Sequence, residues 1–181
     1  MHDVVRDMVI KSIGPRVGYM VNTGMKLIEV PNEHEWATNL NKVSLMANYI
    51  SKNPVGLTPK CSTLSTLILS NNPLTKIPES FFKNMSGLKV LDLSRTNIEA
   101  LPSFISKLEH LFALRLRGCE RLKCLPSLEK LVALKKLDLR RVGIEVVPQG
   151  MEMLVSLEYL DLFCEDLNEI PTGVLSKLSS L

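Results

Sequence analysis

Aliphatic residues recur along this chain at one fixed interval. Aligned on the line L-x-x-L-x-L-x-x-N-x-L, the sequence matches at six successive places, and the first leucines are separated by 23 or 24 residues. With the one that opens a seventh line, these first leucines are Leu40, Leu64, Leu88, Leu111, Leu134, Leu157 and Leu181. One period repeated six times predicts a protein built of stacked structural turns.

Each line predicts a short strand followed by a return segment. Within x-L-x-L-x the apolar positions alternate, so a strand points them inward and leaves their neighbours outward. Proline early in the return predicts a short helix or 3₁₀ turn there. The clearest line, with the start of its return, contains Leu64, Leu67, Leu69, Asn72, Leu74, Ile77 and Pro78.

Stacking of these turns predicts the fold class. The strands would form a parallel sheet on a concave face, and the returns would cover the convex side. One turn cannot bury its leucines alone, so contacts between neighbouring turns drive folding. The line resembles the leucine-rich repeat, and we predict an α/β fold, a curved leucine-rich-repeat solenoid over residues 36–181. The side chains expected to close the core from the convex side are Phe81, Ile105, Leu108, Leu131, Leu154 and Leu178.

The asparagine position of the line changes along the chain. Asn48 and Asn72 keep it, where the side chain is expected to bond to the backbone of its own and the neighbouring turn. The later lines replace it with Thr96, Cys119, Val142 and Glu165. We therefore predict less regular turns from Thr96 onward, with the fold unchanged.

Residues 1–35 lie outside the matched lines. The apolar residues of 1–13 follow helical spacing, and Gly14-Pro15 would end that helix. Residues 19–21 and 25–30, joined by a turn at 22–24, predict a small hairpin. A helix and a hairpin this short hardly fill a core, so we predict that residues 1–35 are the remnant of a separate domain and that residues 36–181 form the solenoid.

Composition excludes several classes of protein. The chain has 181 residues, of which 5 % are aromatic, so its core must be aliphatic. A net charge of +3 is small for a nucleic-acid binder. The four cysteines show no C-x-x-C spacing, and no apolar run approaches the roughly 20 residues that cross a bilayer. We therefore predict free thiols, no zinc site, no nucleic-acid partner and no membrane span.

No catalytic constellation is recognisable in the sequence. His2, His34 and His110 lie far apart, without a metal-ligand partner or a nucleophile at a suitable spacing. The phosphate-binding line G-x-x-x-x-G-K-[ST] is absent. The sequence therefore predicts a binding protein rather than an enzyme, with no cofactor of its own.

A family resemblance begins at the first residues. Met1-His2-Asp3 resembles the MHD motif of plant nucleotide-binding, leucine-rich-repeat disease resistance proteins, especially those of the coiled-coil class. The resemblance continues through Val30-Pro31, Trp36, Val43-Ser44-Leu45-Met46, Phe81-Phe82-x-x-Met85 and Val90-Leu91-Asp92-Leu93-Ser94.

The resemblance implies roles for the first residues. Residues 1–35 would end the winged-helix part (ARC2) of the NB-ARC module, which binds ADP or ATP with Mg²⁺ in the full-length family. His2 would contact the ADP diphosphate, with Asp3 as its structural support. We read the chain as a piece of a larger receptor, in which only the full-length protein holds nucleotide.

Outward strand positions are the candidate contact residues, because they do not serve the core. Basic side chains gather on two turns, flanked by two aspartates, and two aromatic residues lie one turn further on. A solvated face of alternating charge and a docking surface for an acidic partner, or for the receptor's own NB-ARC module, both fit this pattern. The candidates are Arg115, Arg117, Lys136, Asp138, Arg140, Arg141, Tyr159, Asp161 and Phe163.

The predicted function is that of a plant intracellular immune receptor fragment, in the cytoplasm or at the cytoplasmic face of the plasma membrane. Its repeats would sense a pathogen effector or a modified host protein and restrain the nucleotide switch. An extracellular receptor is the alternative, because Asn84-Met85-Ser86 is a glycosylation sequon. A truncated resistance-gene product without activity of its own is another.

Overall fold

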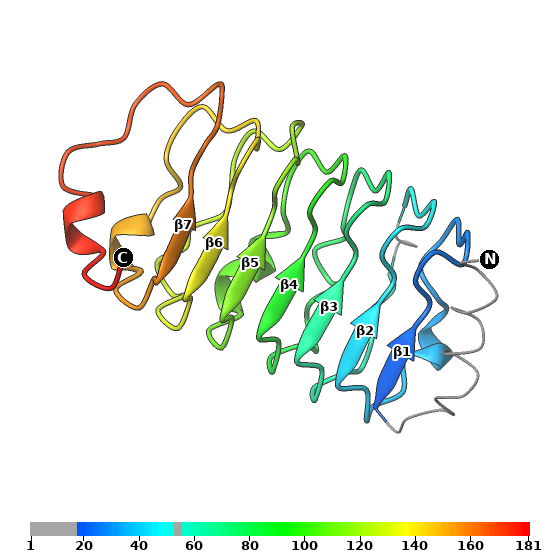
Figure 1. Ribbon diagram of the computed structural model, residues 1–181. Coiled ribbons are helices and arrows are strands. Elements are labelled where there is room, and N and C mark those ends of the chain that lie inside the picture. Colours follow the sequence, from blue (N-terminus) through cyan, green and yellow to red (C-terminus); the bar gives the residue numbers. More distant parts are fainter. Residues whose placement is uncertain (1–17, 53–55) are drawn as a thin grey trace, which may run out of the picture.

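The computed structural model describes residues 18–52 and 56–181 and has one parallel sheet as its central element (Figure 1). Seven strands lie in sequence order, and each pairs in parallel with the next. Their bounds are β1 Tyr19–Val21, β2 Lys42–Ser44, β3 Thr66–Ile68, β4 Val90–Asp92, β5 Ala113–Arg115, β6 Lys136–Asp138 and β7 Tyr159–Asp161. The predicted leucine-rich-repeat solenoid is therefore confirmed.

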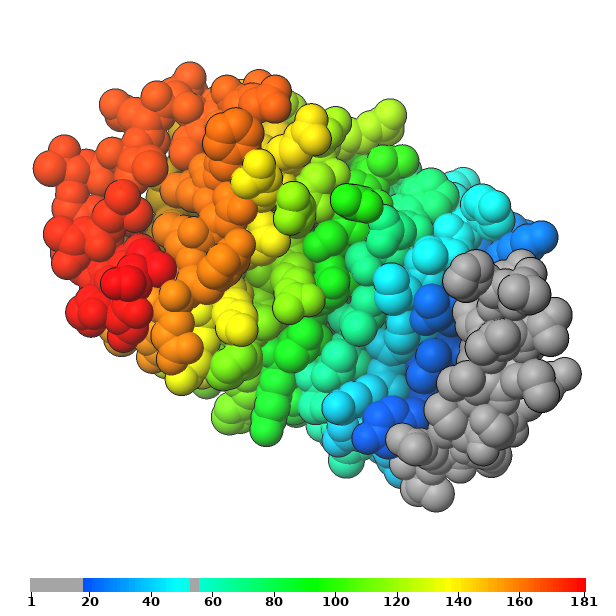
Figure 2. Space-filling view, in the orientation of Figure 1, coloured from blue at the N-terminus to red at the C-terminus, as the bar shows by residue number. Residues whose placement is uncertain are grey.

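All six strand pairings keep the same register. The middle residue of one strand faces the middle residue of the next, as Leu67 faces Leu91 and Leu91 faces Leu114. These three side chains are fully buried, and the first and third strand residues point away from the core. Figure 2 shows the turns packed side by side as successive bands. We call the surface formed by the outward residues of β1–β7 the sheet face; it is the face predicted as concave.

The return segments close the core from the opposite side. All six side chains predicted to do this are buried. Three short 3₁₀ helices stand in these returns, η2 Ser103–Lys107, η3 Met151–Met153 and η4 Leu175–Lys177, each shortly after a proline as predicted. A fourth, η1 Glu33–Glu35, precedes the buried Trp36. The Trp36 ring meets the Phe81 ring edge-on at 5.8 Å, so aromatic packing fills the core near the first turns.

Asparagine side chains connect the early turns. The Asn72 amide donates to the carbonyl oxygens of Leu45 and Leu69, each at 2.9 Å. Its side-chain oxygen accepts from the Ile50 N–H at 3.1 Å. Asn48 repeats the arrangement one turn earlier, with a bond of 2.7 Å to the carbonyl of Asn22. Both expected asparagine contacts are confirmed.

The later turns use weaker donors at this position. The Thr96 hydroxyl bonds to Leu93 of its own turn at 2.8 Å, and the Cys119 thiol reaches the same carbonyl from the next turn at 3.1 Å. In the last turn the Cys164 thiol donates to the Leu139 carbonyl at 3.0 Å. The sequence alignment placed Glu165 at this position, which is wrong by one residue, because the turn after β7 is tighter: the Cys164 N–H bonds to Leu162 at 2.9 Å.

The predicted hairpin at residues 19–30 is wrong. β1 pairs with β2 in parallel, so residues 19–21 form the first strand of the solenoid sheet. The sequence does carry a mark of this additional strand: Met20 and Val43 are 23 residues apart, which matches the period of the later lines. Asn22 occupies the place of a leucine, and this substitution hid the additional turn. The sheet therefore begins ahead of the division expected at residue 36.

The earlier part of the expected N-terminal domain is not tested. The helix predicted over residues 1–13, with His2 and Asp3, lies outside the described residues. Its assignment to a winged-helix remnant stays a prediction.

Candidate functional site

The sheet face places the predicted contact residues in columns. The third strand residues Asp92, Arg115, Asp138 and Asp161 face one another in register across β4 to β7. The first strand residues form a second column, in which Lys136 faces Tyr159. A strand advances about 3.3 Å per residue, so the two columns lie roughly 7 Å apart. These residues thus share columns on the sheet; their role in binding stays a prediction.

The aspartates of this face accept hydrogen bonds from backbone N–H groups in the turns that follow the strands. One carboxylate oxygen of each accepts the N–H two residues further on: Asp138 accepts from Arg140 at 3.1 Å, and Asp161 accepts from Phe163 at 3.2 Å. Asp92 accepts from Ser94 in the same way, at 2.9 Å. Such Asx-type bonds end a strand and set the direction of the next residues. Asp138 and Asp161 therefore have a structural role besides the contact role predicted for them.

Two arginines reach across to the neighbouring strand. Arg115 Nη1 lies 3.9 Å from Asp92 Oδ2, and Arg140 Nη1 lies 3.6 Å from Asp161 Oδ2. The Arg140 guanidinium also lies over the Phe163 ring, 5.2 Å from its centroid. The Arg115 and Arg140 side chains remain 52 % and 43 % exposed. Exposed pairs of this kind contribute less than about 1 kcal/mol to stability, so they orient the guanidinium groups while leaving them open to a partner.

A hollow of about 610 Å³ opens beside these residues, where the chain leaves the strands. Four arginines, one aromatic ring and two carboxylates line it. We call it the arginine hollow; its lining residues are Arg95, Arg117, Gly118, Glu120, Arg140, Arg141, Phe163 and Glu165. Within the described part of the chain, no carboxylate forms an ion pair with Arg95, Arg117 or Arg141.

Backbone bonds between consecutive turns hold the hollow together. The N–H groups of Arg95, Gly118 and Arg141 donate to the next turn, at distances of 2.7 to 2.8 Å. All three donors have left-handed backbone angles, with φ of 55°, 74° and 56°. This geometry turns the chain sharply after each strand and brings the arginines of successive turns to one edge of the sheet.

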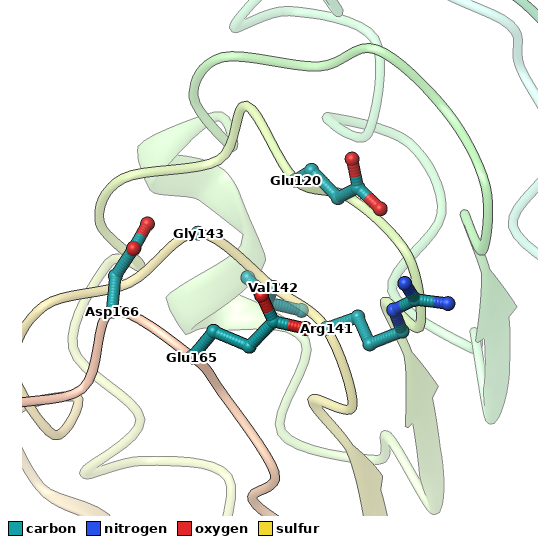
Figure 3. A pocket seen from close by; sticks show the side chains of 6 residues that line it. All are labelled: Glu120, Arg141, Val142, Gly143, Glu165 and Asp166. Atoms are coloured by element: carbon teal, nitrogen blue, oxygen red, sulfur yellow. The ribbon is translucent and has the colours of Figure 1, made fainter.

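A second hollow of about 260 Å³ adjoins the first and is more acidic. Figure 3 shows its lining, in which Arg141 extends toward the turn that carries Glu120. Its lining residues are Glu120, Arg141, Val142, Gly143, Glu165 and Asp166. No three His, Cys, Asp or Glu side chains in residues 18–52 and 56–181 are placed so that they could hold one metal ion.

The nine predicted contact residues thus divide into two groups. Arg115, Arg117, Arg140, Arg141 and Phe163 gather where the strands end, beside the two aspartates. Lys136 and Tyr159 lie at the start of their strands, away from the hollow. Sequence reasoning missed Arg95, although its spacing of 46 residues from Arg141, two repeat periods, was a usable signal.

The remaining reactive groups lie elsewhere. Burial raises the pKa of the Cys61 thiol to about 11 and also raises the pKa of the Cys119 thiol. His34 and His110 are exposed, on η1 and on a return segment. No helix in the described ranges is both long and apolar enough to span a membrane.

Comparison with known proteins gives consistent results. A family model described as leucine rich repeat matches residues 62–120. The chain is 38 % identical over its whole length to the disease resistance protein At4g27190 of Arabidopsis thaliana and covers 19 % of that protein. It is 39 % identical over 73 % of its length to the probable disease resistance protein At4g27220 of the same plant, of which it covers 15 %. The chain therefore spans less than a fifth of the length of these two relatives.

Solved structures share the solenoid. The ectodomain of the Arabidopsis receptor kinase GASSHO1/SCHENGEN3, solved with CASPARIAN STRIP INTEGRITY FACTOR 2, superposes with a TM-score of 0.69 at 25 % identity. It covers 86 % of this chain, which covers 19 % of that one. The Leptospira interrogans protein LIC12759 gives a TM-score of 0.60 at 26 % identity, over 86 % and 45 % of the two chains. The chain is a leucine-rich-repeat segment that is similar over its whole length to plant disease resistance proteins of the nucleotide-binding, leucine-rich-repeat type.

Proposed function

We propose that this segment is the protein-recognition surface of an intracellular plant immune receptor. Its sheet face binds a pathogen effector, or a host protein that an effector has altered, and in the resting receptor it restrains the nucleotide-binding module. The single observation that carries the proposal is the group of exposed arginines at the end of β5 and β6, oriented by Asp92 and Asp161 and flanked by Phe163.

The composition of this surface supports protein recognition. Arginine and aromatic side chains supply most anchors of protein interfaces. The inward leucines beside Arg115 and Arg140 are fully buried, so these two arginines are held by a rigid frame. The inward leucines are Leu114, Leu116, Leu137 and Leu139. Recognition would then shift the receptor between a restrained and an active state, because the partner binds one state better than the other.

The experiment reverses two charges in the full-length receptor. Arg115→Glu with Arg140→Glu should raise defence signalling in the absence of pathogen, abolish the response to it, or do both. Lys60→Glu with Lys83→Glu is the matched control, because both lysines are exposed and lie off the sheet face. Unchanged restraint and unchanged recognition in the arginine variant, at normal protein level, would refute the proposal.

An extracellular receptor is the second candidate. The glycosylation sequon at Asn84 lies on a return segment, and the solenoid is similar to a receptor-kinase ectodomain. The Asn84 amide, however, is half-buried and donates to the Thr58 carbonyl at 3.4 Å. A mass loss on glycosidase treatment of the native plant protein would favour this candidate over the intracellular one.

A further inference from the structure

We propose that the arginine hollow binds a phosphate monoester carried by a side chain of the protein partner. The inference rests on the proposed protein-recognition function and specifies the chemistry of the group that is recognised.

The charge of the hollow is complementary to a dianion. Its lining holds four arginines against Glu120 and Glu165, an excess of two positive charges. Arg95, Arg117 and Arg141 form no ion pair with the described residues, so their guanidinium groups are free to take an anion. A phosphate monoester carries about −1.5 to −2 charges at pH 7. One such group would neutralise the excess.

The arginines converge because successive turns are joined at this edge. The Arg95 N–H donates to the Arg117 carbonyl at 2.7 Å, and the Gly118 N–H donates to the Arg140 carbonyl at 2.8 Å. Neighbouring strands lie about 4.8 Å apart. Long side chains on consecutive turns can therefore reach one compact anion from several sides.

Gly118 gives the hollow its shape. A Cβ atom at this position would lie 3.3 Å from Cγ of Arg95. Without it, the aliphatic part of Arg95 lies close to the backbone of the next turn. Among the lining residues, Arg95 comes from the first turn and Phe163 from the last. All cations of the lining are arginines, whose planar fork matches phosphate oxygens in a bidentate way.

A compact phosphate fits better than a long run of carboxylates. Glu120 and Glu165 line both hollows, and Asp166 adds a third carboxylate to the second one. An extended acidic segment that continued past Arg141 would meet these like charges. Phe163 is 58 % exposed at the other side and offers apolar surface to the residues that flank the phosphorylated side chain.

The test uses the chain of residues 1–181 with three degenerate peptide libraries, which carry phosphoserine, phosphotyrosine or unmodified serine at the fixed central position. We expect retention of one or both phosphorylated libraries at least about tenfold above the serine library, in 150 mM salt at pH 7.5. The two phosphorylated arms identify which residue carries the phosphate. Retention should fall to the serine level with Arg117→Gln and Arg141→Gln, and stay unchanged with Lys60→Gln and Lys83→Gln.

Competition separates the phosphate from other anions. Phenyl phosphate should displace the retained peptides, and succinate at the same concentration should not. Equal retention of the three libraries, or retention that survives the arginine variant, would overturn the inference. If that happens while Arg115→Glu with Arg140→Glu still alters receptor signalling, the recognition function stands and only the phosphate chemistry is wrong.

Discussion

The side-chain amide of Asn72 donates to the carbonyl oxygen of Leu45, one turn earlier, at 2.9 Å. The same nitrogen bonds to Leu69 of its own turn, and the side-chain oxygen accepts from the N–H of Ile50. One buried side chain thus bonds to backbone groups of two turns, and it shares the Leu45 carbonyl with the Asn48 amide, which donates to that oxygen at 2.9 Å. It links neighbouring repeats where the sheet has ended and only loops remain.

Replacement of Asn72 by alanine should therefore destabilise the solenoid strongly. The variant removes the bonds that Asn72 makes to the Leu69 carbonyl and the Ile50 N–H, and each buried group left without a partner costs about 1–3 kcal/mol. We expect Asn72→Ala to lower the free energy of unfolding by about 2–4 kcal/mol, measured by urea denaturation. Asn97→Ala is the control, because Asn97 is exposed and lies one residue beyond the asparagine position in the next turn. An equal loss of stability in both variants would contradict the role of the Asn72 side chain in linking the turns.

The fold could be predicted because its information is local and periodic. Leucines such as Leu67, Leu91 and Leu114 occur at equal spacing, and each must be inward if the strands are stacked in register. The same repeat spacing also predicted which side chains close the core from the convex side. The first turn was missed because Asn22 stands where the repeat line L-x-x-L-x-L has an inward leucine, and that leucine is one of the few fixed positions of the line.

The site could be predicted only in part. The sequence placed Arg115 and Arg140 on the sheet face, but not their pairing with Asp92 and Asp161, which depends on rotamers across strands. It also omitted Arg95, which lies in the turn after β4, two repeat periods before the predicted Arg141. The left-handed backbone of that turn, which brings Arg95 to the hollow, has no marker here as clear as the glycine at 118.

Gly143 should tolerate no side chain. A Cβ atom there would overlap the carbonyl oxygen of Glu120 in the preceding turn, and the contact is with backbone, which cannot rotate away. We expect Gly143→Ala to cost about 1–3 kcal/mol of stability by thermal or urea unfolding.

Gly56→Ala is the matched comparison for that variant. Gly56 has a φ of +85° but no atom within 4 Å of the added carbon, so alanine pays only the backbone cost of about 1 kcal/mol. A smaller loss at Gly143 than at Gly56 would show that the turns can separate at this contact without cost.

The four cysteines should react at very different rates. Burial raises the pKa of the Cys61 thiol to about 11, and it raises the pKa of the Cys119 and Cys164 thiols as well. These groups stay protonated at pH 8, where only the thiolate reacts. Cys124 is exposed. Brief treatment with iodoacetamide at pH 8 should add one label, at Cys124, by intact mass and peptide mapping.

Unfolding in urea should expose all four thiols to the same reagent. Rapid native labelling of Cys119 would contradict its position between Thr96 and the Leu93 carbonyl. Cys124→Ser, which removes the exposed thiol, should abolish the fast label without a change in stability.

The ion pair between Arg140 and Asp161 should contribute little to folding. Both partners are partly exposed, so solvent and salt screen the charges, whose nearest atoms lie 3.6 Å apart. A double-mutant cycle with Arg140→Ala and Asp161→Ala should give a coupling energy below about 1 kcal/mol, and less at high salt. Asp161→Ala alone should cost more than Arg140→Ala, because it also removes the acceptor of the Phe163 N–H. A coupling of several kcal/mol would mean that Arg140 is a structural residue, and the signalling effect of its reversal would then report unfolding rather than a lost partner.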